Sequence, residues 1–157
     1  MTRTKKILAS PPLGLMELKV KHIMNSRPRT VKTDTSIKGL IERFRGQIEG
    51  CFPVINKKKK LVGIVTESDV LDIFKKPTRH ALFGASMIKE ARKGAATHVN
   101  EIMTGHPIVA TPDMSVDELI KLMTAHKLRH LPVVKNNKLV GMVTLRQVME
   151  LYQMIER

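Results

Sequence analysis

The chain has 157 residues, 42% hydrophobic and 27% charged, a composition typical of a folded globular protein and not of a disordered one. Lysine and arginine number 28 against 14 aspartate and glutamate, so the net charge of +14 favours polyanionic partners or the phosphates of a small ligand. Aromatic residues make up only 3% and tryptophan is absent, which argues against a base-stacking surface.

The first 17 residues are expected to form an N-terminal tail. This segment is basic, but its apolar run is only Ile7-Leu8-Ala9, so no signal peptide is predicted. Longer apolar runs such as 61–65 also fall far short of the roughly 20 residues that cross a bilayer. The single cysteine, Cys51, permits no intrachain disulfide and fits a reducing compartment as a small buried hydrophobe. We therefore expect a cytoplasmic protein with no membrane partner.

Residues 18–74 predict one β-α-β-β-α unit, preceded by a short turn around Ile23-Met24. Ser36 is an N-cap ahead of apolar residues at helical spacing, and two apolar runs, 52–55 and 61–65, enclose a polar turn, as in a β-hairpin. Thr66 begins a second helix. The apolar side chains expected on the inner side of that helix are Val70, Leu71 and Phe74.

Residues 75–96 form a basic connector, in which a short helix is predicted after Ser86 and ends at Gly94. A connector of this length either covers a binding cleft or is a solvated charge run, and the second interpretation is favoured.

Residues 97–157 repeat the first unit. Ser115 and Thr144 again precede helices, and the inner side of the last helix is expected to hold Val148, Leu151 and Tyr152. The repeat rests on ten residues that recur 79 positions later. The first copy has Val20, Ile23, Met24, Pro28, Asp34, Ser36, Leu40, Ile41, Pro53 and Val54, and the second has Val99, Ile102, Met103, Pro107, Asp113, Ser115, Leu119, Ile120, Pro132 and Val133.

A unit of roughly 50 residues buries its apolar face poorly, so the two copies are expected to pack against each other. The predicted fold class is α/β (α+β), with two β-α-β-β-α repeats packed with pseudo-two-fold symmetry.

The junction between a strand and a helix at Thr66-Glu67-Ser68-Asp69 is the strongest candidate binding site. A helix start presents unpaired N–H groups to an anion, and Asp69 could accept hydrogen bonds from the two hydroxyls of a ribose. The same pattern is also a capping box that needs no ligand, and so is Thr144-x-x-Gln147. Duplication favours the binding interpretation, because two such helix starts would face a shared cleft.

The paired units, with Ile-Met near each start, Pro-Val in each hairpin and Gly-Ile-Val-Thr-x-x-Asp in the first copy, resemble cystathionine-β-synthase (CBS) domains. Two in tandem resemble a Bateman module. The resemblance covers residues 18–74 and 97–155. It implies a regulatory sensor that binds AMP, ADP, ATP or S-adenosylmethionine between the repeats, without a cofactor, and signals through conformation or a partner.

The resemblance also implies which residues bind the ligand. Thr66 would contact phosphate and Asp69 the ribose, while Arg129 and His130 would reach the phosphates from the second repeat. The adenine would lie along two short segments, made up of Thr30, Val31, Cys51, Phe52 and Pro53. His130 is about equally well explained as a partly buried histidine at a strand start.

The second repeat departs from this pattern. Gln147 stands where the first repeat has Asp69, and Gly50 and Cys51 stand where the second has Arg129 and His130. One site per chain is therefore expected, with Arg146 as a supplementary phosphate contact.

Neither a metal site nor a catalytic group is expected. His126 and His130 have helical metal spacing, but the predicted helix ends between them. No nucleophile and base are recognisable, so the chain is not expected to be an enzyme. The family resemblance adds a homodimer. Because no effector domain is recognised in the sequence, an effector protein acted on in trans is also expected. The alternative function is nucleic-acid binding through the basic surface, although no reading helix is identifiable.

Overall fold

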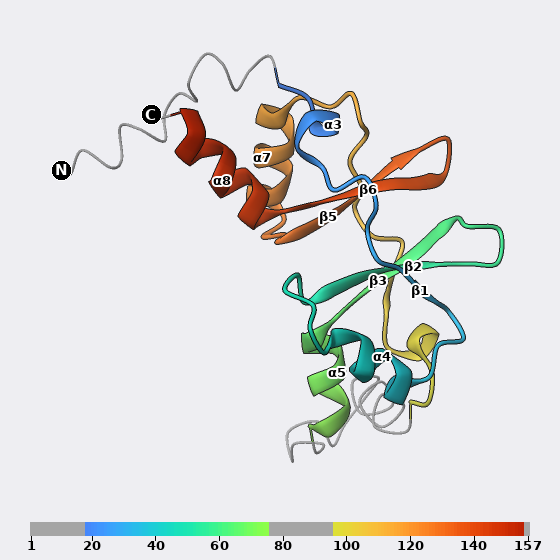
Figure 1. The fold of residues 1–157 in the computed structure, drawn as a ribbon. Helices are drawn as coiled ribbons and strands as arrows, with labels where there is room; N and C mark the ends of the chain where they lie inside the picture. Colours follow the sequence, from blue (N-terminus) through green and yellow to red (C-terminus); the bar gives the residue numbers. More distant parts are fainter. Residues whose placement is uncertain (1–17, 76–95, 156–157) are drawn as a thin grey trace. The chain divides into compact units, whose positions relative to one another are not determined.

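The computed structural model describes residues 18–75 and 96–155, in two compact units (Figure 1). Unit 1 combines Met1–Pro28 with Ile108–Arg157, and unit 2 is Arg29–Pro107. The predicted tail and the body of the connector, including the helix after Ser86, lie outside the described residues.

Unit 2 is built on a sheet of four strands in the order β1-β2-β3-β4. The central hairpin joins β2 (Cys51–Ile55) to β3 (Leu61–Thr66) in antiparallel register, as the two apolar runs predict. The short β1 (Val31–Lys32) pairs with β2 in parallel, and β4 (Thr104–Gly105) pairs with β3. Among the described residues of this unit, the helical elements are α4 (Ile37–Phe44), α5 (Glu67–Phe74) and the 3-10 turn η2 (Val99–Glu101).

Unit 1 repeats this layout around a two-stranded sheet, β5 (His130–Lys135) and β6 (Lys138–Thr144). The helices in the described part of this unit are α3 (Val20–Ile23), α7 (Val116–Ala125) and α8 (Leu145–Ile155). Single bridges from Ala110 to Val133 and from Asn25 to Met142 stand where unit 2 has β1 and β4. The two units are therefore copies of one mixed α/β plan.

Both predicted serine caps are present. Ser36 Oγ accepts the N–H of Gly39 at 3.1 Å, and Ser115 Oγ accepts the N–H of Glu118 at 3.1 Å. The Glu118 carboxylate accepts the Ser115 N–H in return, which completes a capping box at the start of α7. These bonds satisfy backbone donors that would otherwise be unpaired in the first turn, so both helices begin where the sequence predicts.

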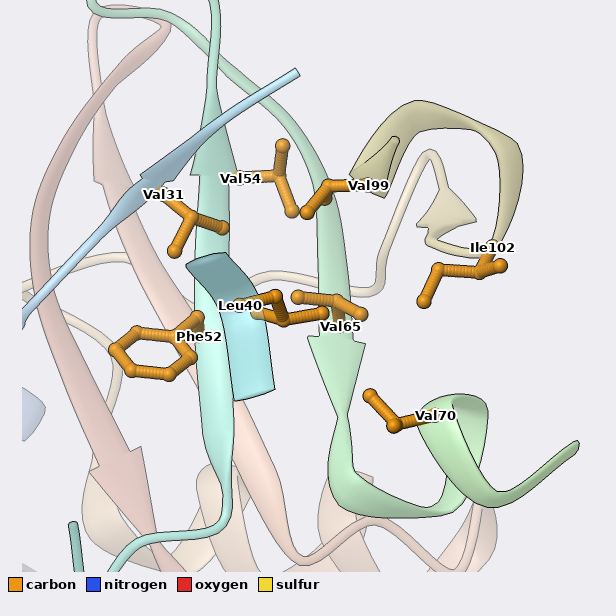
Figure 2. Packing of buried hydrophobic residues seen from close by; sticks show 8 residues of the cluster. All are labelled: Val31, Leu40, Phe52, Val54, Val65, Val70, Val99 and Ile102. Carbon is orange, nitrogen blue, oxygen red and sulfur yellow. The ribbon is translucent and has the colours of Figure 1, made fainter. Parts of the chain in front are cut away.

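The core of unit 2 draws on β1, the central hairpin, α4, α5 and the segment around η2 (Figure 2). The eight buried side chains are Val31, Leu40, Phe52, Val54, Val65, Val70, Val99 and Ile102. In unit 1, Val148, Leu151 and Tyr152 of α8 pack inward as predicted.

Two apolar residues of α5, in contrast, do not pack on the core. Leu71 is 63% exposed and Phe74 70% exposed, because the helix packs on the core through Val70 and the partly buried Ile73 instead. The prediction that Leu71 and Phe74 lie on the inner side was wrong.

Each unit contains the opening segment of the other repeat. In unit 2, Val99 N–H donates to the Thr35 carbonyl and Ile37 N–H to the Thr97 carbonyl, both at 2.9 Å. In unit 1 the equivalent bonds run from Val20 to Met114 and from Val116 to Leu18, also at 2.9 Å. The sequence repeats and the compact units are therefore different divisions of the chain.

Candidate functional site

The start of α5 is closed by a capping box between Thr66 and Asp69. Asp69 Oδ2 accepts the Thr66 backbone N–H at 2.8 Å and the Thr66 hydroxyl at 2.9 Å. The Asp69 N–H donates to Thr66 Oγ at 3.4 Å in return. Both side chains are half-buried. These bonds commit one carboxylate oxygen of Asp69 and the hydroxyl proton of Thr66 to the helix start.

This arrangement leaves one oxygen of Asp69 for another partner. Among the hydrogen bonds of residues 18–75 and 96–155, Oδ1 of Asp69 accepts none, whereas Oδ2 accepts two. An ionised carboxylate oxygen that lies beside a helix start can accept hydroxyl donors. The Thr66 hydroxyl, in contrast, can donate to a phosphate only if it turns away from Asp69.

The N–H of Glu67, the first residue of α5, is also paired. It donates to the carbonyl of Gly50 at 3.1 Å. Gly50 has a φ of +61°, a backbone conformation that is strained for residues with a side chain. A Cβ there would also lie 3.1 Å from the Glu67 carboxylate. The loop before β2 is thus tied directly to the helix start.

The residues predicted to contact adenine lie on neighbouring strands of unit 2, except Thr30, which directly precedes β1. Val31 pairs with Val54 in the parallel ladder, and Cys51 pairs with Thr66 across the hairpin. The side chains of Val31, Cys51 and Phe52 are buried, and Phe52 packs on Phe44 with ring centroids 4.9 Å apart. Since these side chains belong to the core, only the backbone groups of these strand residues are left to contact a ligand.

Cys51 is 1% exposed. Burial raises the pKa of its thiol well above the ordinary value, and the nearby carboxylates of Glu49 and Asp69 raise it further. The thiol therefore stays protonated and unreactive at neutral pH, which agrees with the prediction of a small buried hydrophobe.

The second repeat has the same frame with different chemistry. The Gln147 side-chain oxygen accepts the Thr144 N–H at 2.8 Å, and the Leu145 N–H donates to the Arg129 carbonyl at 2.8 Å. A neutral amide thus caps α8 where a carboxylate caps α5. The other polar group of Gln147 is an amide donor, which cannot accept the hydroxyls of a ribose.

The predicted site residues are divided between the units. Unit 2 holds seven of them: Thr30, Val31, Cys51, Phe52, Pro53, Thr66 and Asp69. Unit 1 holds Arg129, His130 and Arg146. Arg129 and Arg146 are exposed, and the half-buried His130 is the first residue of β5.

Two contributors were missed from the sequence. Gln47 Nε2 donates to the Cys51 carbonyl at 2.9 Å and so fixes the first residue of β2. Gly50 supplies the carbonyl that accepts from Glu67. A glycine just ahead of an apolar run was a usable signal, whereas nothing in the sequence distinguishes Gln47 from other loop residues.

Within the described parts of the chain, no group of three or more histidine, cysteine or acidic residues is placed to hold a metal ion. His126 caps the end of α7 and His130 begins β5, so the two do not share a helix. Among the same residues, no helix has both the length and the apolar character needed to cross a bilayer.

Comparisons with known proteins agree with the repeated fold. A family model described as "CBS domain" matches residues 20–76 and 99–153. Protein MJ1426 of Methanocaldococcus jannaschii is 33% identical over 83% of this chain and 89% of its own length. YlbB of Bacillus subtilis is 37% identical over 61% of this chain, and the match spans 56% of YlbB.

Solved structures give the same result. The structure of CBSX2 in complex with AMP superposes with a TM-score of 0.79 and 26% identity, over 88% of this chain and 99% of that one. A structure of CBSX2 from Arabidopsis thaliana superposes with a TM-score of 0.70 and 28% identity, over 88% of this chain and 96% of that one. The CBS domain pair of MJ0100, in complex with 5′-methylthioadenosine and S-adenosyl-L-methionine, superposes with a TM-score of 0.68 and 26% identity. The match covers 87% of this chain and 96% of that one.

Proposed function

The chain belongs to the CBS-domain family, and we propose that it is a regulatory module that binds an adenosine derivative and catalyses no reaction itself. AMP, ADP, ATP and S-adenosylmethionine are the candidate ligands. The similar structures of CBSX2 and MJ0100 were determined with adenosine compounds, which supports this ligand class.

The observation that carries the proposal is the divided role of the Asp69 carboxylate. Oδ2 caps α5, and Oδ1 accepts no hydrogen bond from the described residues. A ribose offers two adjacent hydroxyl donors, which suit an ionised acceptor fixed in this way. The helix cap thereby keeps the acceptor oriented before the ligand arrives.

The remaining contacts are part of the proposal. The adenine would lie against the backbone of 30–31 and 51–53, and Thr66 would donate to a phosphate after releasing Asp69. Arg129 and His130 would add positive charge for the phosphates, with Arg146 as a supplementary contact. We propose one such site per chain, because Gln147 replaces the carboxylate in the second repeat.

Isothermal titration calorimetry of the full chain with adenosine, AMP, ATP and S-adenosylmethionine tests the proposal. In Asp69→Asn the amide oxygen can still cap Thr66, as that of Gln147 caps Thr144, but the second oxygen becomes a donor. A hydrogen bond to a charged group contributes about 1.5–3 kcal/mol, so affinity should fall roughly ten- to a hundredfold. Asp72→Asn removes the same charge from the same helix outside the cap and is the matched control.

A second variant separates ribose from phosphate recognition in the same experiment. Arg129→Gln should weaken AMP binding while adenosine binding is unchanged, because only AMP carries a phosphate. No heat with any adenosine compound, or equal affinity of Asp69→Asn and Asp72→Asn, would refute the proposed site.

We further propose that the chain acts as a homodimer on an effector protein in trans, in a cytoplasmic setting. Leu71 and Phe74 are exposed on α5, and an apolar helix face of this kind supports self-association. Analytical ultracentrifugation with and without AMP tests whether the ligand shifts the monomer–dimer equilibrium.

A further inference from the structure

The turn between β2 and β3 is a rigid support for four consecutive lysines, Lys57–Lys60, here called the lysine tip. Asn56 Oδ1 accepts the N–H of Lys58 at 2.9 Å and that of Lys60 at 3.0 Å. The Asn56 carbonyl accepts the Lys59 N–H at 2.9 Å, and the Asn56 N–H donates to the Lys60 carbonyl at 3.0 Å. The backbone of the turn is thus fixed by one asparagine.

All four lysines of the tip are exposed. No acidic residue occurs between Glu49 and Glu67, and none of the ion pairs formed by the described residues includes a lysine of the tip. Four like charges on a short fixed turn repel one another, which disfavours the folded state. The cluster therefore works against stability instead of supporting it.

The equivalent turn of unit 1 indicates that the hairpin does not need these lysines. There the hairpin closes through Asn136 and Asn137, at φ of 51° and 61°, with one lysine on each side. Asparagine tolerates this left-handed conformation well. In the lysine tip, Lys59 occupies it instead, at φ 59°. The turn of unit 2 thus holds more positive charge than its geometry requires.

We propose that the lysine tip binds the phosphodiester backbone of a nucleic-acid duplex without reading its sequence. A duplex carries about one negative charge per 1.7 Å of its axis in a fixed lattice, and the hydrogen-bonded turn keeps four lysines together on one short segment of backbone. Lipid headgroups diffuse and adapt to any cation arrangement, so they gain little from a rigid turn. The tip has no aromatic residue to stack on unpaired bases, which favours a duplex over a single strand.

The tip is separate from the helix-start end of the proposed nucleotide site, where Asp69 lies. Thr66 and Cys51 lie at the opposite end of the hairpin from the tip. About five residues of strand at roughly 3.3 Å each place the two ends about 17 Å apart. Duplex binding is therefore expected to be unchanged in Asp69→Asn, so the two proposals can fail independently.

Fluorescence anisotropy of labelled 20-base-pair DNA and RNA duplexes, titrated with the full chain across a range of salt concentrations, tests the proposal. The tip variant is Lys57→Gln/Lys58→Gln/Lys60→Gln, which leaves the strained position 59 untouched. The control, Lys38→Gln/Arg45→Gln/Lys121→Gln, removes the same charge from exposed positions on α4, at its C-cap and on α7. Each lost phosphate contact should lower the slope of log K against log salt by about 0.9, so the tip variant should lose roughly two to three units.

The control should keep nearly the wild-type slope and affinity. Equal losses in both variants would mean that overall charge governs binding, and would overturn the proposal. Wild-type duplex binding by a tip variant with unchanged thermal unfolding would also overturn it. So would a tip variant that loses binding only to phosphatidylserine vesicles, because the partner would then be a membrane.

Discussion

Gly63 and Gly141 let a methionine from the other repeat lie directly on a strand. A Cβ on Gly63 would lie 2.5 Å from Met103 Sδ and 3.0 Å from the Thr104 carbonyl oxygen. At Gly141 the corresponding distances from a Cβ are 2.5 Å to Met24 Sδ and 3.1 Å to the Asn25 carbonyl oxygen. A thioether can move, but a carbonyl held in a strand pair cannot, so both positions need glycine for space.

We therefore expect Gly63→Ala to lower the free energy of unfolding by about 1–3 kcal/mol, the usual range for overpacking. Gly105→Ala is the control, since a Cβ there has no neighbour within 4 Å. Urea denaturation followed by circular dichroism compares the two. A Gly63→Ala midpoint equal to that of Gly105→Ala would contradict the close contact.

At this scale the sequence predicted the capping residues correctly but not which side of α5 is buried. Thr66 with Asp69, and Thr144 with Gln147, form the capping boxes that their spacing predicts. Leu71 and Phe74 were expected on the inner side of the helix together with Val70. A helix of eight residues buries only a narrow stripe, and the neighbouring elements decide which stripe that is.

Among the elements, the turn η2 depends on one acidic side chain. The Glu101 carboxylate accepts the Thr97 N–H at 3.0 Å, the Thr97 hydroxyl at 2.9 Å and the His98 N–H at 2.9 Å. These bonds hold the pKa of Glu101 below its ordinary value. Because the folded-state pKa lies below the unfolded one, the stabilisation is present above the unfolded pKa and is lost as pH falls through the folded one.

The expected outcome is that Glu101→Gln flattens the acid limb of the stability curve, with little change in its shape between pH 6 and 7. Urea midpoints measured from pH 7 down to pH 3 test this. Glu150→Gln, an exposed acid on α8, should leave the limb as in the wild type. An identical acid limb in wild type and Glu101→Gln would argue against the cap.

The sequence predicted the long elements and missed the shortest. Serine caps and apolar runs located α4, α7 and both hairpins. The strand β4 has only two residues, Thr104–Gly105, and both are exposed, so no apolar pattern in the sequence predicts it. Its pairing with β3 is set by Met103 seated over Gly63, a contact between distant parts of the chain.

At the scale of the whole molecule, the repeat could be read from the sequence, but the exchange of opening segments could not. The Ile-Met segments of the two repeats are so alike that either one suits either hairpin by pattern alone. Hydrogen bonds such as Val99 to Thr35 in unit 2 and Val20 to Met114 in unit 1 settle the pairing. The long connector that precedes the second segment gives no local signal for the choice.

This pairing predicts which fragment folds. A fragment of residues 29–107 contains the whole core of unit 2, including Val99 and Ile102. A fragment of residues 18–74 matches the first repeat but lacks both of these side chains. Deleting two large buried residues costs several kcal/mol, comparable with the total stability of a small domain.

We expect cooperative thermal unfolding and dispersed amide resonances from 29–107 only. Circular dichroism and a two-dimensional NMR spectrum of each fragment decide this. A well-folded 18–74 fragment would mean that the first repeat completes its own core.

The exchange also fixes an order of events during synthesis. Translation proceeds at about 5–20 residues per second, so Leu18 and Val20 emerge from the ribosome roughly 5–20 s before their partners near Met114 and Val116. Everything that unit 2 requires has been made by Pro107. The nascent chain can therefore complete unit 2 first, while the opening segment of unit 1 waits in solvent for the last third of the polypeptide.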